Sequence, residues 1–194
     1  MDCAGLRIGV AMCGSYCTFE ETIQQIRKLV EHGADVLPIM SENAVGYDTR
    51  FGTSKYFMRL LERITGKEII CTLCEAEKVG PQDMADIILV MPCTGNTLAK
   101  LANGITDTAV LMAVKGLMRN NKPICIAIST NDALGLNLEN IGKLLNIKNI
   151  YFVPFNQDNH ESKPKSMTAN IELVIPTIEK AIKKEQIQPI INCS

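Results

Sequence analysis

Apolar positions along the chain form two kinds of run, and each kind predicts a different element. Near-continuous apolar runs predict buried strands at 6–11, 34–40, 87–91, 124–128 and 150–155, and a weaker run predicts one more at 69–72. Between them, apolar residues recur every three or four positions and predict helices at 19–32, 54–65, 95–103, 108–118, 136–145 and 168–183. Because strands alternate with helices, we expect an α/β fold: a three-layer, Rossmann-like, doubly wound parallel sheet of about six strands.

Capping residues predict where several helices begin and end. Thr18, followed three positions later by Glu21, predicts a capping box at the start of the first helix, and Gly33 predicts its left-handed stop. Asp107 is a candidate cap for the helix that starts at 108. Pro176 lies inside the last helical run and predicts a kink or a late restart. Polar, glycine-containing or proline-containing stretches predict loops at 44–53 and 156–166.

Four polar turns follow predicted strands, at 13–17, 41–43, 92–97 and 129–132. In doubly wound sheets, ligands bind beyond the carboxyl ends of the strands, where these turns are expected to meet. The turn at 92–97 opens a helix, so its free N–H groups and the helix dipole attract an anion. A dinucleotide loop is not favoured, because Gly14 is the only glycine of the usual G-x-G-x-x-G pattern. The turns predict a phosphate held mostly by neutral donors, as in flavin mononucleotide (FMN).

Composition limits the other functions that need to be considered. The length of 194 residues favours one domain, 1–194. With 20 basic and 21 acidic residues, the net charge of −1 gives no reason to expect nucleic acid or an anionic membrane as a partner. No apolar run reaches the roughly 18 residues of a membrane span, and the start lacks a signal-peptide pattern, so we expect a cytoplasmic protein. The eight cysteines are expected to be mainly core residues, with no metal site.

The turn at 92–97 and the helix after it carry a family resemblance. Pro92-Cys93-Thr94-Gly95-Asn96-Thr97 and the following helix resemble the signature of flavoproteins that include homo-oligomeric flavin-containing cysteine decarboxylases and flavin prenyltransferases. The resemblance implies a homo-oligomer, a trimer or dodecamer, whose interfaces complete an FMN site. It implies that FMN is bound by Gly14, Ser15, Tyr16, Ser41, Thr94, Gly95, Asn96, Thr97 and Asn131. The alternative is that the threonine turn, Ser15 and Ser41 only cap helices and that Asn131 forms an Asx turn.

Departures from the family pattern bear on the chemistry. The decarboxylases carry an active-site histidine after the second strand, whereas residues 41–70 contain none. Their Pro-x-Met-Asn motif after the fifth strand is replaced by Ile128-Ser129-Thr130-Asn131, and the arginine expected in prenyltransferases near that turn is missing. Neither standard activity fits, and no residue is assigned to proton transfer.

Further motifs resemble a B-subunit branch of the same family. They lie at 13–18, 49–52, 129–135 and 153–158, with Lys163-Pro164 just beyond. This resemblance implies a flavin-type subunit that acts with an NAD(P)-binding A subunit to form dipicolinate from a dihydrodipicolinate-level precursor during sporulation. Arg50 and Lys163 are candidate ligands for the anionic substrate. A decarboxylase of a cysteine-derived carboxylate and a flavin-free scaffold for the A subunit remain as alternatives.

Overall fold

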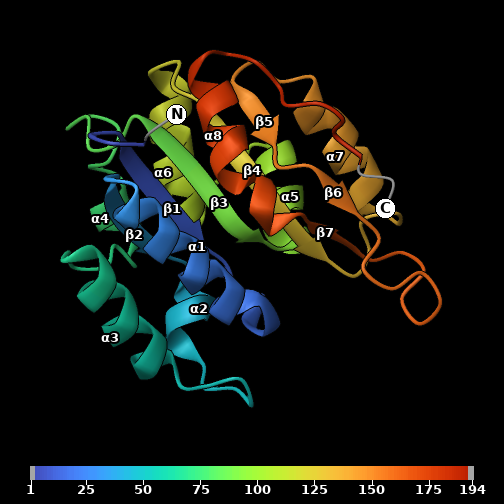
Figure 1. Ribbon diagram of the computed structural model, residues 1–194, viewed down its shortest axis with the longest axis horizontal. Helices are drawn as coiled ribbons and strands as arrows, with labels where there is room; N and C mark the ends of the chain where they lie inside the picture. The colour runs from blue at the N-terminus through green and yellow to red at the C-terminus, as the bar shows by residue number, and fades with distance from the viewer. Residues whose placement is uncertain (1–2, 192–194) are drawn as a thin grey trace.

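The computed structural model describes residues 3–191, and a twisted sheet runs through its centre (Figure 1). Its parallel strands are neighbours in the order β2 (Asp35–Met40), β1 (Arg7–Met12), β3 (Ile87–Cys93), β4 (Ile124–Thr130) and β5 (Ile150–Phe152). Beyond β5, the end of β4 pairs antiparallel with β7 (Met167–Ala169), which pairs antiparallel with β6 (Phe155–Asn156). The predicted parallel sheet is confirmed, with a short antiparallel extension at the edge where β4 ends.

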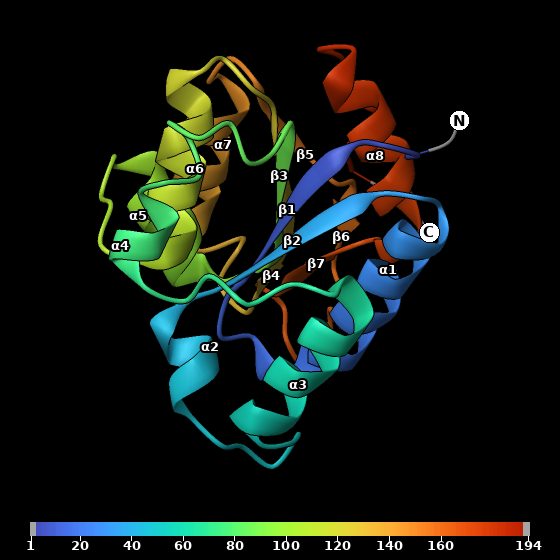
Figure 2. The same cartoon turned by 90° about the vertical axis from the view of Figure 1, so that its left-hand side faces the viewer.

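Helices cover both faces of the sheet, as Figure 2 shows. One layer contains α1 (Phe19–Glu31), α3 (Ser54–Thr65) and α8 (Val174–Ile182). The other contains α4 (Leu73–Ala76), α5 (Gly95–Ala102), α6 (Ala109–Arg119) and α7 (Asn137–Leu145). Shorter helical turns are η1 (Tyr16–Thr18), α2 (Glu42–Gly46) and η2 (Ile171–Leu173). The three-layer, doubly wound architecture expected from the sequence is therefore confirmed.

Burial on both faces explains why the central strands read as continuous apolar runs. Along β3, Ile88 and Val90 belong to the core on the α5–α6 side, whereas Ile87 and Leu89 belong to the core on the α1–α8 side. Successive side chains of a strand point to opposite faces, so each face requires its own apolar residues. All seven residues of β3 are buried.

Two predicted strands are wrong in detail. The run 69–72 forms only an isolated bridge between Ile39 and Ile70, because Thr72 already caps α4 in a capping box with Glu75. The run 150–155 divides into β5 and β6, and residues 167–169, predicted as part of a loop and helix, form β7. Short strands whose hydrogen-bond partners are distant in sequence leave no periodic signal of their own.

Several helix boundaries also differ from the predictions. The capping box at Thr18 is wrong, because its hydroxyl donates to the carbonyl of Ser15 within η1. Asp107 is not the cap of α6; Thr108 accepts from the Leu111 N–H instead, and Asp107 pairs with Lys100. The region 44–53 is not entirely loop, since α2 extends to residue 46. The late restart is confirmed, because α8 begins after η2, and Pro176 lies in its first turn.

A cluster of charged residues lies at the edge of the sheet where the parallel strands begin, opposite the four polar turns. The Asp86 carboxylate accepts from the Arg7 backbone N–H and Nε, both at 3.1 Å. These hydrogen bonds, with Lys122 nearby, lower the pKa of Asp86 to about 2. The cluster links the start of β1 to the segment before β3. In the described part of the chain, no helix is long and apolar enough to cross a membrane.

Candidate functional site

The four predicted turns meet at the carboxyl edge of the sheet. After β1, the Ser15 hydroxyl lies 3.0 Å from the hydroxyl of Ser129 at the end of β4. The Tyr16 hydroxyl donates to the Asn43 carbonyl at 2.7 Å, which joins the first turn to the second. These contacts follow from the parallel order of β2, β1, β3 and β4, since all four strands end at the same edge.

Thr94 and Thr97 build the amino end of α5. The Thr94 hydroxyl accepts from the Thr97 N–H at 3.3 Å and donates to the Thr97 hydroxyl at 3.2 Å. Thr97 is buried, and its hydroxyl donates to the Cys13 sulfur at 3.2 Å. Its side chain therefore joins α5 to the end of β1, while Asn96 is exposed at the helix start. Thr94 acts as an N-cap, which is the arrangement expected whether or not a ligand is bound.

Cys13 and Cys93 lie in the core beside these turns. Burial raises the pKa of Cys13 to about 11, against the opposing effect of the Thr97 hydrogen bond, and raises that of Cys93 well above its usual value. A thiol must ionise to act as a nucleophile. Both cysteines are therefore core residues at neutral pH, as the sequence predicts, whereas the same prediction is wrong for Cys17, which is exposed.

Gly95 holds α5 close to the turn after β4. A Cβ atom at Gly95 would lie 2.6 Å from both Asn137 Nδ2 and Thr130 Oγ1. Those groups belong to a polar network in which the Asp132 carboxylate accepts from the Thr130 hydroxyl at 2.9 Å and from the Asn137 amide at 2.7 Å. Only a residue without a side chain permits this approach. The structure thus gives Gly95 a packing role, while its predicted contact with the cofactor stays a prediction.

A cavity of about 260 Å³ lies between the turn after β1, the end of β4 and the loop 157–166 that leads into β7. Ser15, Asn131 and Lys163, which the sequence singles out, line it. Lys163 Nζ is 3.4 Å from the Asp158 carboxylate, and the Ser166 hydroxyl donates to Asn131 Oδ1 at 3.4 Å. Hydroxyls, an amide and one ammonium group therefore face this space, together with the carboxylates of Glu21 and Asp158.

Asp158 is the acidic group paired with Lys163 at this cavity. Burial would raise the pKa of its carboxyl group, but hydrogen bonds from Ser166 and its own backbone N–H, with the charge of Lys163, hold it below the usual value. Asp158 is thus ionised at neutral pH and keeps Lys163 turned toward the loop. An entering anion would compete with Asp158 for this ammonium group.

Other predicted site residues lie farther from the cavity or have structural partners. Arg50 lies in the loop between α2 and α3, where its guanidinium stacks 4.8 Å from the centre of the Phe51 ring, and it does not line the cavity. Ser41 is buried and caps α2 by accepting from the Ala44 N–H at 3.3 Å. Gly14 would tolerate a Cβ, which would meet only the Tyr16 ring at 3.5–3.6 Å. The fold itself therefore does not require glycine at position 14.

The sequence reading missed several residues that line the cavity. Glu21 of α1, and Asp158 and Ser166 of the late loop, were not assigned to the site, and Ser129 was placed in a ligand turn but given no contact of its own. For Asp158 and Ser166, the sequence offered only the polar composition of 156–166. It predicted a loop but not that this loop would lie beside the cavity. Within residues 3–191, no group of three or more His, Cys, Asp or Glu side chains is arranged to hold a metal ion.

Comparison with known proteins identifies the family. The family model described as Flavoprotein matches residues 2–189. The chain belongs to the flavoprotein family. Its family resemblance in the turn at 92–97, read from the sequence, is therefore confirmed.

Two relatives show which branch of the flavoprotein family this chain resembles. Over 187 residues, it is 46% identical to the B subunit of dipicolinate synthase from Bacillus subtilis (strain 168), covering 96% of this chain and 94% of that protein. The crystal structure of the dipicolinate synthase B subunit from Bacillus halodurans is 42% identical, with a TM-score of 0.92 over all of both chains. The predicted resemblance to the B-subunit branch is confirmed by these homologues.

More distant flavoproteins share the fold. The FMN-dependent cysteine decarboxylase SpaF superimposes with a TM-score of 0.65 at 19% identity, covering 94% of this chain and 98% of its own. The present chain has only two histidines of its own. His32 lies at the end of α1, where its Nδ1 is 2.7 Å from the Lys28 carbonyl, and His160 is exposed in the late loop. Neither histidine lines the cavity. A histidine base of the decarboxylase kind is therefore not present at this cavity.

Proposed function

We propose that this flavoprotein is the B subunit of a dipicolinate synthase. In this role it acts with an NAD(P)-dependent A subunit to form dipicolinate from a dihydrodipicolinate-level precursor during sporulation. The observation that carries the proposal is the 46% identity to the B subunit of a dipicolinate synthase along nearly the full length of both chains. The polar cavity at the carboxyl edge of the sheet supports it, because a dicarboxylate requires hydroxyl, amide and cationic donors.

We infer FMN as the cofactor from the family; of the nine residues predicted to contact it, Ser15 and Asn131 line the cavity. Ser15, Ser129 and the amino end of α5 offer neutral donors for a phosphate, and Asn131 offers an amide for a ring edge or carboxylate. A Cβ at Gly14 would make only ordinary contacts of 3.5–3.6 Å with Tyr16, so the fold itself does not require a glycine beside these donors. When bound, FMN supplies a two-electron acceptor. The cofactor contacts of Tyr16, Ser41, Thr94, Gly95, Asn96 and Thr97 are part of the same proposal.

The proposed reaction removes two electrons and two protons from the dihydropyridine ring, which becomes aromatic. NAD(P)⁺ on the A subunit is the proposed final acceptor of a hydride equivalent, and the remaining proton passes to solvent or a base. In this chain, Lys163 and the hydroxyls of Ser129 and Ser166 would bind one substrate carboxylate. We propose Arg50 for the second carboxylate, although it lies in the loop between α2 and α3 and does not line this cavity.

Assembly into a trimer or dodecamer is also proposed. The cavity of about 260 Å³ within one chain lies just below the roughly 300–1,000 Å³ usual for cofactor-sized ligands. A second copy at its open side would enlarge and close it. The related DmrB structure, described as a cubic protein cage for redox transfer, is a homo-oligomeric member of this fold. We propose that the assembly works in the cytoplasm.

The function can be tested with purified subunits. FMN affinity would be measured by fluorescence quenching, and dipicolinate formation by the A subunit would be followed with and without this chain. We expect Lys163→Ala to lower kcat/KM about tenfold or more, mainly by raising KM, since a charge-assisted hydrogen bond contributes about 1.5–3 kcal/mol. Lys148→Ala provides the control, because Lys148 is exposed and does not line the cavity.

The alternatives give different results in the same assays. Stimulation of the A subunit without any FMN binding would identify a flavin-free scaffold. Release of carbon dioxide from a cysteine-derived carboxylate, without an effect on the A subunit, would identify a decarboxylase. If neither binding nor stimulation is observed, the proposal is wrong.

A further inference from the structure

A second surface, which shares no lining residue with the cavity, has the composition of a protein interface. It comprises residues 47–67, namely the loop after α2 together with α3, and we call it the α3 face. Tyr47, Phe51 and Tyr56 are 61%, 42% and 52% exposed. These are the exposed aromatic residues of the part of the chain that the structure describes. Aromatic and arginine side chains are enriched at protein interfaces and dominate their binding energy.

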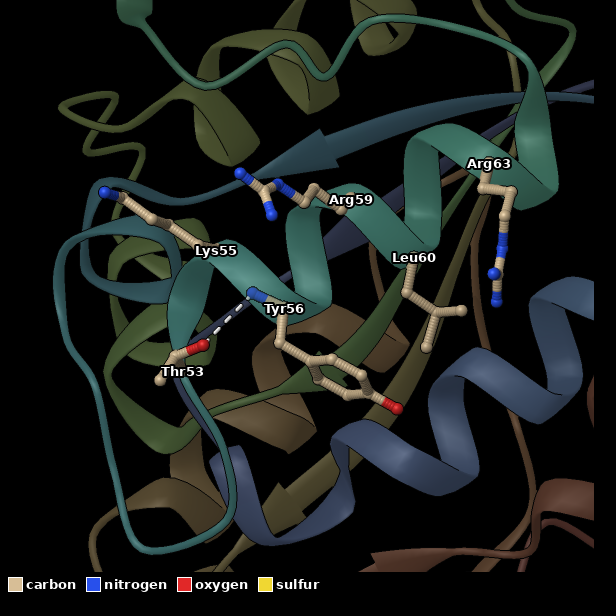
Figure 3. Close-up of a pocket in the computed structure, with 6 residues that line it drawn as sticks. All are labelled: Thr53, Lys55, Tyr56, Arg59, Leu60 and Arg63. Atoms are coloured by element: carbon tan, nitrogen blue, oxygen red, sulfur yellow. Dashed lines mark hydrogen bonds between the residues drawn. The ribbon is translucent and has the colours of Figure 1, made fainter.

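Basic residues form a stripe along α3. Lys55, Arg59 and Arg63 are spaced by four residues, so they lie on one side of the helix. All three are exposed, and none forms an ion pair with another described residue. In Figure 3, Lys55 and Arg59 extend away from α1, whereas Tyr56, Leu60 and Arg63 point toward it. With Thr53, these side chains line an open hollow of about 470 Å³.

The charge of the α3 face contrasts with the rest of the molecule. Residues 47–67 contain five of the 20 basic residues of the chain but only two of its 21 acidic residues. The face is therefore positive on a protein whose net charge is −1. Arg50 adds to this positive field beside Phe51, on which it stacks. Opposite charge on a partner would accelerate and orient its binding.

We propose that the α3 face binds an acidic surface of a different polypeptide, with Tyr56 and Leu60 at its apolar centre. Carboxylates of the partner pair with Lys55, Arg59 and Arg63. A symmetric dimer of this chain through the same face would place one basic stripe against another, which like-charge repulsion disfavours. The copies of a closed trimer meet through two different faces, so this argument does not apply to the proposed trimer, and light scattering of the variants tests that case. The identification of the partner as the A subunit rests on the proposed function.

Docking here would bring the partner close to the candidate site. The Tyr16 hydroxyl, in the turn after β1, donates to the carbonyl of Asn43 in α2. Ser41 caps the same helix directly after β2. A partner on the α3 face would therefore lie beside α2, the helix that supports two of the four turns. This position suits a subunit that exchanges reducing equivalents with the cavity.

A matched pair of charge reversals tests the docking surface. Lys55→Glu with Arg59→Glu reverses the α3 stripe, and Lys115→Glu with Arg119→Glu reverses two basic residues with the same spacing on α6. All four residues are exposed and have no described ion pair. Binding of the purified A subunit to the full chain would be measured by titration calorimetry. We expect the α3 variant to bind at least about tenfold more weakly, more so at low salt, and the α6 variant to bind within about twofold of wild type.

Further measurements distinguish the possible failures. Melting temperature and FMN affinity should be unchanged in the α3 variant, and Tyr56→Ala should weaken partner binding without reversing charge. If the double charge reversal and Tyr56→Ala both bind the A subunit as wild type does, the docking surface is refuted, although the two subunits still interact. Loss of homo-oligomers in light scattering would show that the face joins copies of this chain, and would also refute the proposal. If wild type itself does not bind the A subunit, the proposed function fails as well.

Discussion

At the scale of single residues, the absence of a side chain at position 95 controls how the turns approach each other. Gly95 permits Thr130 and Asn137 to reach the start of α5, and Asp132 holds both of them by hydrogen bonds. The turn that carries Asn131 is thereby joined to the turn that carries Thr94. Small residues in polar turns can therefore serve packing as directly as they serve a ligand.

Gly95→Ala should lower stability. The added Cβ would overlap Asn137 and Thr130, and overpacking of this kind costs about 1–3 kcal/mol. We expect the melting temperature to fall by several degrees, at about 2–4 °C for each kcal/mol. Gly142→Ala is the matched control on α7, because a Cβ there meets nothing within 4 Å. It should stabilise the helix by up to about 1 kcal/mol. Equal melting temperatures for the two variants would contradict this account.

At the scale of elements, N-capping hydroxyls organise the helices that follow the strands. Ser41, Thr53, Thr72, Thr94 and Thr108 each accept a hydrogen bond from the first turn of the next helix. The sequence analysis considered Ser41 and Thr94 as caps, but it placed Thr53 in a loop, Thr72 in a strand and Thr108 inside its helix. Thr94 and Ser41 differ from the other three because both are also predicted to contact FMN.

Replacing two of these caps separates capping from ligand binding. Thr94→Ala and Thr108→Ala each remove one side-chain cap, and each should cost about 1 kcal/mol in urea unfolding. Only Thr94→Ala should also weaken FMN binding, since it disturbs the amino end of α5. If both variants bind FMN as wild type does, Thr94 is a structural cap alone. A larger stability loss in Thr94→Ala would reflect its added hydrogen bond to Thr97.

At the scale of the whole molecule, the site lies at the edge of one chain and remains open. The loop 157–166 extends outward beyond β6 and β7 (Figure 1) and forms one wall of the cavity. Its backbone is fixed by the hydrogen bond from the Leu134 N–H to the Lys165 carbonyl at 3.0 Å. A neighbouring copy could supply the opposite wall.

Light scattering should therefore detect a trimer or a larger closed assembly. FMN affinity should fall on dilution to concentrations where the assembly dissociates, because part of the site would then be lost. Denaturing mass spectrometry provides the control that the chains are intact. A monomer that binds FMN with undiminished affinity at every concentration would contradict a site completed between copies.

The sequence was a good guide wherever burial was uniform. Ile87 to Val90 are apolar without interruption because both faces of β3 are covered, and the periodicity of α1 and α3 reports one buried face each. It was a poor guide where a hydrogen-bond partner was distant, as for β7, or where two residues competed for one cap, as for Asp107 and Thr108. Capping and edge pairing depend on geometry that a local pattern does not contain.

The sequence alone determined the layer architecture, the four polar turns at one edge and the family, since these follow from burial periods and short motifs. Only the tertiary structure decided which turn residues face a cavity and which face the protein. Thr97 points to Cys13 and Gly95 packs against Asn137, while Lys163, 68 positions after Gly95 in the chain, reaches the cavity. Distances between segments so far apart are set by the packing of the whole sheet, and no local run of residues records them.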